Sequence, residues 1–324
     1  DIFAGEAISL TASTGALSTI GTSDAGSFSA DAGDSINLDG DVVTETGGVA
    51  IGQTIEPSGS IVLDATIDSD TTVAIDAGGD ITLNAADQII SNDGTRIDAG
   101  NVLDLNGNVT ASTVTLNADD DLSIAGVTTA TDGAILATAG GNAVITDLLE
   151  ATTDVTVSAA GNLATDEIMA GVPANPTTGH VTLTAGESLV MNDAIDAVGN
   201  LTATATVNIT QNAEIGLEQD TEIVTFSAET GSVTSSNVIW AASDINVTAG
   251  TDVSSGSSQW TADTGSVTVA ADEDVTLNNR IEANDNISVT AKHALNAGNQ
   301  LLLAATGDIS LSGGDVSGGV AGAA

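Results

Sequence analysis

The sequence contains no cysteine and no tyrosine, only three prolines, and few aromatic residues of any kind. Without cysteine no disulfide can staple the fold, so its stability has to come from hydrogen bonds and packing. Aromatic side chains make up 2% of the chain, whereas hydrophobic residues make up 41%. The interior must therefore be filled by valine, isoleucine, leucine and alanine, which suits a narrow repetitive core.

Positive charge is almost absent. Against 45 acidic residues the chain has only Arg96, Arg280 and Lys292, which gives a formal net charge of -42. This balance argues against nucleic acid as a partner, because binding it requires basic side chains to neutralise phosphates. It argues equally against an anionic membrane surface, and no apolar run of about 18 residues exists that could insert into a bilayer. Repulsion among the carboxylates predicts that salt and divalent cations stabilise the protein.

What the sequence does contain is a repeat of short apolar-polar-apolar triplets separated by Asn, Asp, Gly and Ala. Between residues 267 and 311 every third triplet begins a new cycle, so that Val267, Ile287 and Ile309 mark the starts of successive cycles. Alternation within each triplet and a period of this length are typical of a solenoid, in which short strands stack on those of the preceding coil. We therefore predict one all-β parallel solenoid of about 15 coils with a period of about 21 residues.

The chain divides into three parts on this reading. Residues 1–35 form irregular first coils, residues 36–312 form the regular solenoid, and residues 313–324 form a Gly/Ala-rich tail or junction. The segment 169–180 carries two of the three prolines and no strand triplet, which indicates a projecting loop. With one strand taken from each coil, the positions predicted to be equivalent are Ile36, Ile61, Ile81, Leu103, Leu122, Ala143, Leu163, Val181, Leu201, Val224, Ile245, Val267, Ile287 and Ile309.

The middle residue of each triplet should point outward, because successive side chains of a strand face opposite sides. This residue is most often threonine, with Ser9, Ser123, Ser288 and Ser310 as variants. The threonines are Thr82, Thr115, Thr156, Thr182, Thr202, Thr225, Thr268 and Thr276. The outer faces are therefore expected to be neutral and polar, and most acids are expected at the corners, where Asx side chains and glycine satisfy turn geometry.

The repeats resemble those of large bacterial surface exoproteins of the filamentous-haemagglutinin type. The resemblance is carried by segments such as Gly79-Asp80-Ile81-Thr82-Leu83-Asn84-Ala85, Val181-Thr182-Leu183-Thr184-Ala185-Gly186 and Gly307-Asp308-Ile309-Ser310-Leu311, and it extends over nearly the whole chain. It implies a right-handed parallel β-helix, export to the cell surface, and a role as an adhesive or structural stalk. The amino-terminal secretion domain of that family is not recognisable, and a chain opening on Asp1 is expected to be a processed product or a segment of something longer.

Acidic clusters are the only candidates for catalysis or metal binding. Parallel β-helices can host glycan-cleaving enzymes that use paired carboxylates, and calcium, the one plausible cofactor, prefers carboxylate oxygens. The weak candidates are Asp119, Asp120 and Asp121 in one cluster and Asp272 and Asp274 in another, with Asp68 and Asp70 as a further acidic pair. The favoured interpretation is that these are solvated turn residues that bind counterions diffusely. His180 and His293 lack a second ligand at metal-binding spacing.

Other candidate sites are the two tryptophans, the sequons and the ends of the solenoid. Trp240 and Trp260 are separated by close to one period and are expected at similar places on successive coils. They either have a structural role, filling the interior or an inter-subunit contact, or form a stacking site for a sugar or a partner. Candidate glycosylation sites are Asn108, Asn200, Asn208, Asn246 and Asn286. Candidate assembly residues, at ends where no cap is recognised, are Ile8, Leu10, Ile309 and Leu311.

Together these observations predict a non-catalytic extracellular fibre, stalk or adhesin segment. The expected partners are further copies joined end to end, covalent neighbours in a longer adhesin, and cell-surface glycans. The alternative is a glycan-binding or glycan-cleaving β-helix protein. An ice-binding surface of outward threonines is a weaker alternative, because Ser, Asn, Val and Ala interrupt the threonine positions.

Overall fold

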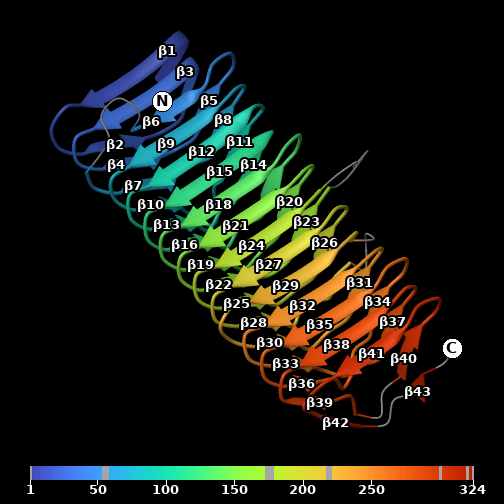
Figure 1. Ribbon diagram of the computed structural model, residues 1–324. Helices are drawn as coiled ribbons and strands as arrows, with labels where there is room; N and C mark the ends of the chain where they lie inside the picture. Colours follow the sequence, from blue (N-terminus) through green and yellow to red (C-terminus); the bar gives the residue numbers. More distant parts are fainter. Residues whose placement is uncertain are drawn as a thin grey trace. The chain divides into compact units, whose positions relative to one another are not determined.

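The computed structural model describes residues 2–52, 58–171, 179–216, 221–298, 301–318 and 321–322. Among these residues every regular element is a β-strand, and none forms a helix that could cross a membrane (Figure 1). The chain falls into two compact units, unit 1 (Asp1–Thr152 and Thr156–Ala159) and unit 2 (Thr153–Val155 and Ala160–Ala324). Both are parallel β-solenoids, and together they make about 14 turns with a period of about 21 residues. The predicted fold class is confirmed.

Each turn contributes one strand to each of three parallel ladders. The first ladder contains in unit 1 β2 (Leu17–Ile20), β4 (Ile36–Asp39), β7 (Ile61–Asp64), β10 (Ile81–Leu83), β13 (Leu103–Leu105), β16 (Leu122–Ile124) and β19 (Ala143–Ile145). In unit 2 it contains β22 (Leu163–Thr165), β25 (Leu189–Met191), β28 (Ile209–Gln211), β30 (Val233–Ser235), β33 (Val253–Ser255), β36 (Val275–Thr276), β39 (Ala294–Asn296) and β42 (Asp315–Ser317).

The second ladder follows the first in every turn. Its strands in unit 1 are β5 (Val42–Thr44), β8 (Ile67–Ser69), β11 (Gln88–Ser91), β14 (Asn108–Ala111), β17 (Thr128–Ala130) and β20 (Leu149–Ala151). In unit 2 they are β23 (Ile168–Ala170), β26 (Ile195–Ala197), β31 (Ile239–Ala241), β34 (Trp260–Ala262), β37 (Ile281–Ala283), β40 (Leu301–Ala304) and β43 (Ala321–Gly322). Ile215 bridges β26 and β31.

The third ladder has the longest regular strands. In unit 1 these are β6 (Val49–Ile51), β9 (Val73–Ala77), β12 (Gly94–Ala99), β15 (Thr113–Ala118) and β18 (Ile135–Ala139), and the boundary between the units falls within β21 (Val155–Ala159). In unit 2 they are β24 (Val181–Ala185), β27 (Leu201–Ala205), β29 (Val224–Ala228), β32 (Ile245–Ala249), β35 (Val267–Ala271), β38 (Ile287–Ala291) and β41 (Ile309–Ser312). At the start of unit 1, β1 (Ile2–Ala12) pairs with β3 (Ser23–Ala32), which pairs in turn with both β5 and β6.

The core of each unit is built from columns of aliphatic side chains in one-to-one register. Ile81 pairs with Leu103, and Leu103 pairs with Leu122; all three are almost completely buried. Alternation places the middle residue of these strands at the surface, as the burial of β10 and β16 shows. The predicted outward threonines are confirmed at Thr82, Thr202 and Thr268. A slip by one residue would turn a whole strand inside out, so the aliphatic pattern fixes the register.

The predicted series of equivalent positions is wrong after Leu163. The structure pairs Leu163 with Leu189, whereas Val181 begins a third-ladder strand and pairs with Leu201. The error arises because all three strands of a turn share the same apolar-polar-apolar pattern, so that only the gap between triplets distinguishes them. The step from Leu163 to Val181 is shorter than the period, which is the signal that could have revealed the change of ladder. Most of the predicted loop 169–180 lies outside the described residues.

Candidate functional site

The first acidic cluster lies at the corner between β15 and β16. Asp119, Asp120 and Asp121 are all exposed, and they lie one after another along the chain rather than around a common point. Asp121 is already engaged, since its Oδ1 accepts hydrogen bonds from the backbone N of Asn142 at 2.7 Å and from its Nδ2 at 3.1 Å. Within the described part of the chain, no group of three or more histidine or acidic side chains is arranged to hold a metal ion.

The second acidic cluster lies at the corner between β35 and β36. Asp272 and Asp274 are exposed there. Asp272 forms an ion pair with Nζ of Lys292 at 2.7 Å, and Oδ1 of Asp274 accepts a hydrogen bond from the N of Ala294 at 2.9 Å. Both carboxylates therefore form contacts with the following turn of the protein.

A repeated hydrogen bond explains why Asx residues recur at the corners. The side-chain oxygen of an Asx residue just before a strand accepts from the backbone N–H of the matching residue one turn later. Asp80 does so with Val102 at 3.2 Å, and Asn208 does so with Ser232 at 2.9 Å. We call these contacts the corner ladders. Sequence reasoning assigned the corner acids to turn geometry and missed this role, although Asx residues at intervals of one turn are the signal for it.

His180 belongs to one of these corner ladders. Its Nδ1 accepts a hydrogen bond from the N of Asn200 at 2.9 Å, and its own N donates to Oδ1 of Asp154 at 2.8 Å. Because Nδ1 acts as an acceptor, it carries no proton in this arrangement. The histidine thus holds neighbouring turns of unit 2 together.

The sequon asparagines occupy different environments. Asn108, Asn208 and Asn286 are exposed corner residues whose Oδ1 atoms accept hydrogen bonds from the following turn. Asn200 is half-buried, with an Oδ1 that lacks a hydrogen-bond partner, and Asn246 points outward from β32. Their glycosylation stays a prediction.

The two tryptophans lie on opposite sides of the same sheet, so the expectation that they share a position is wrong. Trp260 pairs with Ile239 and is 1% exposed, whereas Trp240 pairs with Thr261 and is 38% exposed. The residue that aligns with Trp240 one turn later is Thr261, and Trp260 precedes it by one position. In a strand, a shift by one position places the side chain on the opposite face. Trp260 fills the interior, as one of the alternatives predicted, whereas Trp240 does not.

Trp260 belongs to a polar cluster inside unit 2. Its Nε1 donates a hydrogen bond to Oγ of Ser235 at 3.2 Å, and Ser235 donates to Oε1 of Gln211 at 2.5 Å. In neighbouring turns Oγ of Ser255 donates to Oδ1 of Asn279 at 2.7 Å. These side chains are at most 2% exposed. Polar groups buried this deeply are stabilising only when they are paired, so the hydrogen bonds of Trp260, Ser235 and Gln211 tie three turns together, and that of Ser255 adds the next turn.

The environment of Asp87 in unit 1 disfavours a charged carboxylate. Partial burial raises its pKa first, and the nearby carboxylate of Asp64, followed by those of Asp41 and Asp39, raises it further. Its Oδ2 is buried and has no hydrogen-bond partner. Ionised Asp87 therefore destabilises the folded state.

The Asp87→Asn variant is expected to raise the urea midpoint of unfolding at neutral pH. Because the folded pKa lies above the unfolded one, the stability linked to protonated Asp87 is complete below the unfolded pKa and is lost as pH rises through the raised folded pKa. The benefit should therefore shrink as the pH falls toward the ordinary carboxyl range. Asp68→Asn, which removes an equal charge from an exposed site of the same unit, is the control. An equal gain in both variants at all pH values would contradict the assignment.

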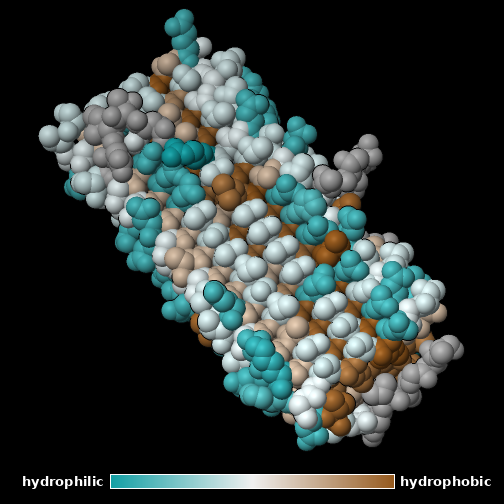
Figure 2. All heavy atoms as spheres, viewed as in Figure 1, coloured by the Kyte–Doolittle hydropathy of each residue, from teal (hydrophilic) through white to brown (hydrophobic). Residues whose placement is uncertain are grey.

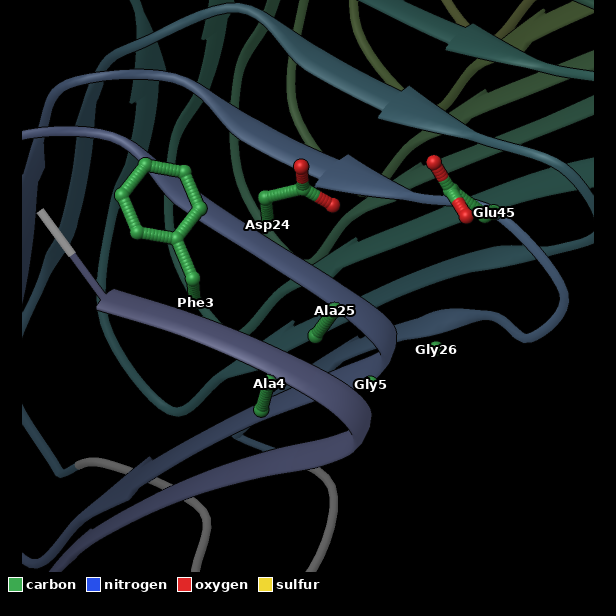
Figure 3. Close-up of a pocket in the computed structure, with 7 residues that line it drawn as sticks. All are labelled: Phe3, Ala4, Gly5, Asp24, Ala25, Gly26 and Glu45. Atoms are coloured by element: carbon green, nitrogen blue, oxygen red, sulfur yellow. The ribbon is translucent and has the colours of Figure 1, made fainter.

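A shallow hollow lies on the first turns of unit 1 (Figure 3). Phe3 pairs in register with Asp24, and the N of Glu45 donates to the O of Ala25 at 3.1 Å. The hollow thus combines one aromatic ring, 71% exposed, with two carboxylates from successive turns. No basic side chain lines it.

The proposed assembly residues lie on the outermost described turns. Ile8 is buried, with only 5% of its surface exposed, whereas Leu10, Ile309 and Leu311 are half-buried. In the preceding turn, the residues that pair with Ile309 and Leu311 are Ile287 and Val289, and both are fully buried. Exposed apolar side chains also mark these turns, namely Ile2, Phe3, Ile20 and Val316.

Comparison with models of known protein families, with curated proteins and with solved structures gives no match. The class of protein is therefore defined by the fold: the chain is a β-solenoid repeat protein. The resemblance to filamentous-haemagglutinin-type exoproteins remains a hypothesis about its origin and role.

Sodium chloride is expected to raise the midpoint of thermal unfolding, because it screens the excess of acidic residues. The Debye length falls from about 10 Å at 0.1 M salt to about 3 Å at 1 M. Calcium could bind either diffusely as a counterion or at ordered sites. Separate titrations with calcium chloride and magnesium chloride at matched ionic strength distinguish these two possibilities. Equal effects indicate diffuse counterions, and a larger effect of calcium indicates ordered sites. A midpoint that falls with sodium chloride would contradict the electrostatic argument.

Proposed function

We propose that the chain is a non-catalytic structural segment of an extracellular fibre, stalk or adhesin of the filamentous-haemagglutinin type. The observation that carries the proposal is the register: inward side chains stack on their counterparts turn after turn, so each turn is a template for the next. Three of the candidate acids support it as well, because the side chains of Asp121, Asp272 and Asp274 contact the following turn.

The partner in this proposal is another turn of the same kind. It covers the half-buried Ile309 and Leu311 at one end and Leu10 at the other. The turn comes either from a second copy or from the same polypeptide in a longer adhesin. An open reading frame that continues the repeat on either side would favour the second source.

Electron microscopy and sedimentation of the purified chain, with and without calcium, test the assembly. We expect elongated particles containing several copies. Leu311→Asp places a charge in the inward column and should leave single copies, whereas Ser310→Asp adds the same charge on the exposed side of β41 and should assemble normally. Uniform single copies of the unmodified chain under every condition would contradict assembly from separate copies.

The surface around Trp240 supports glycan binding as a second candidate function. The indole Nε1 donates to Oδ2 of Asp263 at 3.1 Å, and Glu282, on the same outer surface, accepts from Nε2 of Gln259 at 2.7 Å. An exposed indole beside polar side chains is a common platform for a sugar ring. A glycan array and a reducing-end assay test this candidate, and Trp240→Ala should abolish any signal that Thr234→Ala retains.

A further inference from the structure

The third-ladder strands of unit 2 present two columns of outward side chains on one surface. The first column is Thr182, Thr202, Thr225, Asn246, Thr268, Ser288 and Ser310; the second is Thr184, Thr204, Ser227, Thr248, Ala270, Thr290 and Ser312. We call this surface the hydroxyl array. Every position except Asn246 and Ala270 carries threonine or serine.

The hydroxyl array is ordered in two directions. Successive strands pair one to one without a shift, so that Thr182 pairs with Thr202 and Thr184 with Thr204. Neighbours in a column are therefore about 4.8 Å apart, and the two columns are about 6.6 Å apart along each strand. Figure 2 shows pale side chains standing in regular ranks over these strands. Because threonine is branched at Cβ, its hydroxyl and methyl groups have few alternative orientations.

No charged residue interrupts the array, although the whole chain carries a net charge of -42. Glu187, Glu229 and Asp272 lie at corners just after β24, β29 and β35, and the acids Asp196 and Glu282 lie on second-ladder strands. The equivalent outward positions of unit 1 differ, because β9 and β12 place Asp76, Arg96 and Asp98 there as ion pairs. Neutrality is thus a property of this surface and not of the repeat in general.

These features favour a periodic, uncharged ligand that can both donate and accept hydrogen bonds. Ice meets this description, because a hydroxyl can replace a lattice water as donor and acceptor while the threonine methyl groups lie between such waters. Two hydroxyls of the array, those of Thr204 and Thr248, donate within the protein, to the O of Leu183 and of Phe226 at 3.4 Å, and offer ice only their acceptor side. Charged side chains would instead hold water in strongly oriented shells. Glycans are disfavoured because the array lacks an aromatic platform.

We propose that the hydroxyl array of unit 2 binds the surface of ice. The interruptions that weakened this idea at the level of sequence were Ser, Asn, Val and Ala. The array contains no valine, its serines keep the hydroxyl group, and only Asn246 and Ala270 lack one. Once each residue is assigned to its ladder, the array is nearly continuous. Ice binding is independent of the structural role proposed above, since it needs neither assembly nor a longer chain.

Measurements of ice-crystal shape, thermal hysteresis and ice recrystallisation in solutions of the purified chain test the proposal. The unmodified protein is expected to shape ice crystals and to inhibit their recrystallisation. Replacing both Thr202 and Thr225 with lysine, in adjacent strands of the array, should abolish both effects. The matched control replaces Thr210 and Thr234 with lysine; these are outward threonines of two adjacent first-ladder strands in the same part of unit 2, and the control should retain both effects.

Three results would overturn the proposal. The first is the absence of any effect of the unmodified chain on ice, and the second is equal activity of the array variant and its control. The third is array-dependent binding to crystalline cellulose or chitin, or array-dependent self-association, without an effect on ice. Circular dichroism of both double variants verifies that the fold is intact, so that lost activity reports on the surface alone.

Discussion

Trp260→Ala is expected to destabilise unit 2 by about 3–5 kcal/mol, the usual cost of truncating a buried tryptophan. The indole is the largest fully buried side chain among the described residues, and its removal would leave a cavity in a narrow core. It would also remove the donor to Ser235 from the internal polar cluster. Urea unfolding followed by far-ultraviolet circular dichroism measures the loss without relying on tryptophan fluorescence.

Trp240→Ala is the matched control for this prediction. The same atoms are removed, but the side chain is on the outer face and its indole hydrogen bond to Asp263 is exposed. A loss of about 1 kcal/mol or less is expected. Trp260→Phe should lie between the two, because it keeps an aromatic ring in the core but loses part of the indole together with the donor. Similar losses for both alanine variants would show that the inward and outward assignments are wrong.

Gly126→Ala is expected to cost at least about 1–3 kcal/mol in unit 1, in the range of overpacked sites. A Cβ at this corner would lie 2.3 Å from the O and 2.5 Å from the C of Gly107 in the preceding turn. Both are backbone atoms fixed by the ladders, so relief would require the turns to separate. The readout is the shift of the urea midpoint.

Gly5→Ala gives the comparison for this substitution, since a Cβ there meets nothing within 4 Å. Its effect should stay within about 0.5 kcal/mol. If Gly126→Ala were equally mild, the close stacking of the corners in unit 1 would be incorrect.

The fold could be predicted because one signal dominates the sequence. An aliphatic column such as Ile81, Leu103 and Leu122 needs only alternation and a constant period to be recognised. The assignment of individual strands could not be secured in the same way. Three strands of each turn carry the same pattern, and turn lengths vary, so an error at Leu163 moved every later position to another ladder.

The candidate sites were less predictable than the fold, because they depend on single residues. Trp240 and Trp260 are one residue closer together in sequence than the length of the turn, and this difference makes Trp260 buried and Trp240 exposed. The hydrogen bond from Val102 to Asp80 could not be inferred until the turns were aligned. The hydroxyl array also required the alignment, since it consists of only one of the three ladders of unit 2.

The corner ladders have a direction, and this gives each unit a chemical polarity. In the contacts of Asp80 with Val102, Asn208 with Ser232 and Asp274 with Ala294, the earlier turn supplies the acceptor and the later turn the donor. A copy that continues such a contact must therefore join head to tail. Contacts of that kind are heterologous and leave a free site at each new tip, so they produce open-ended filaments and exclude a closed two-fold dimer.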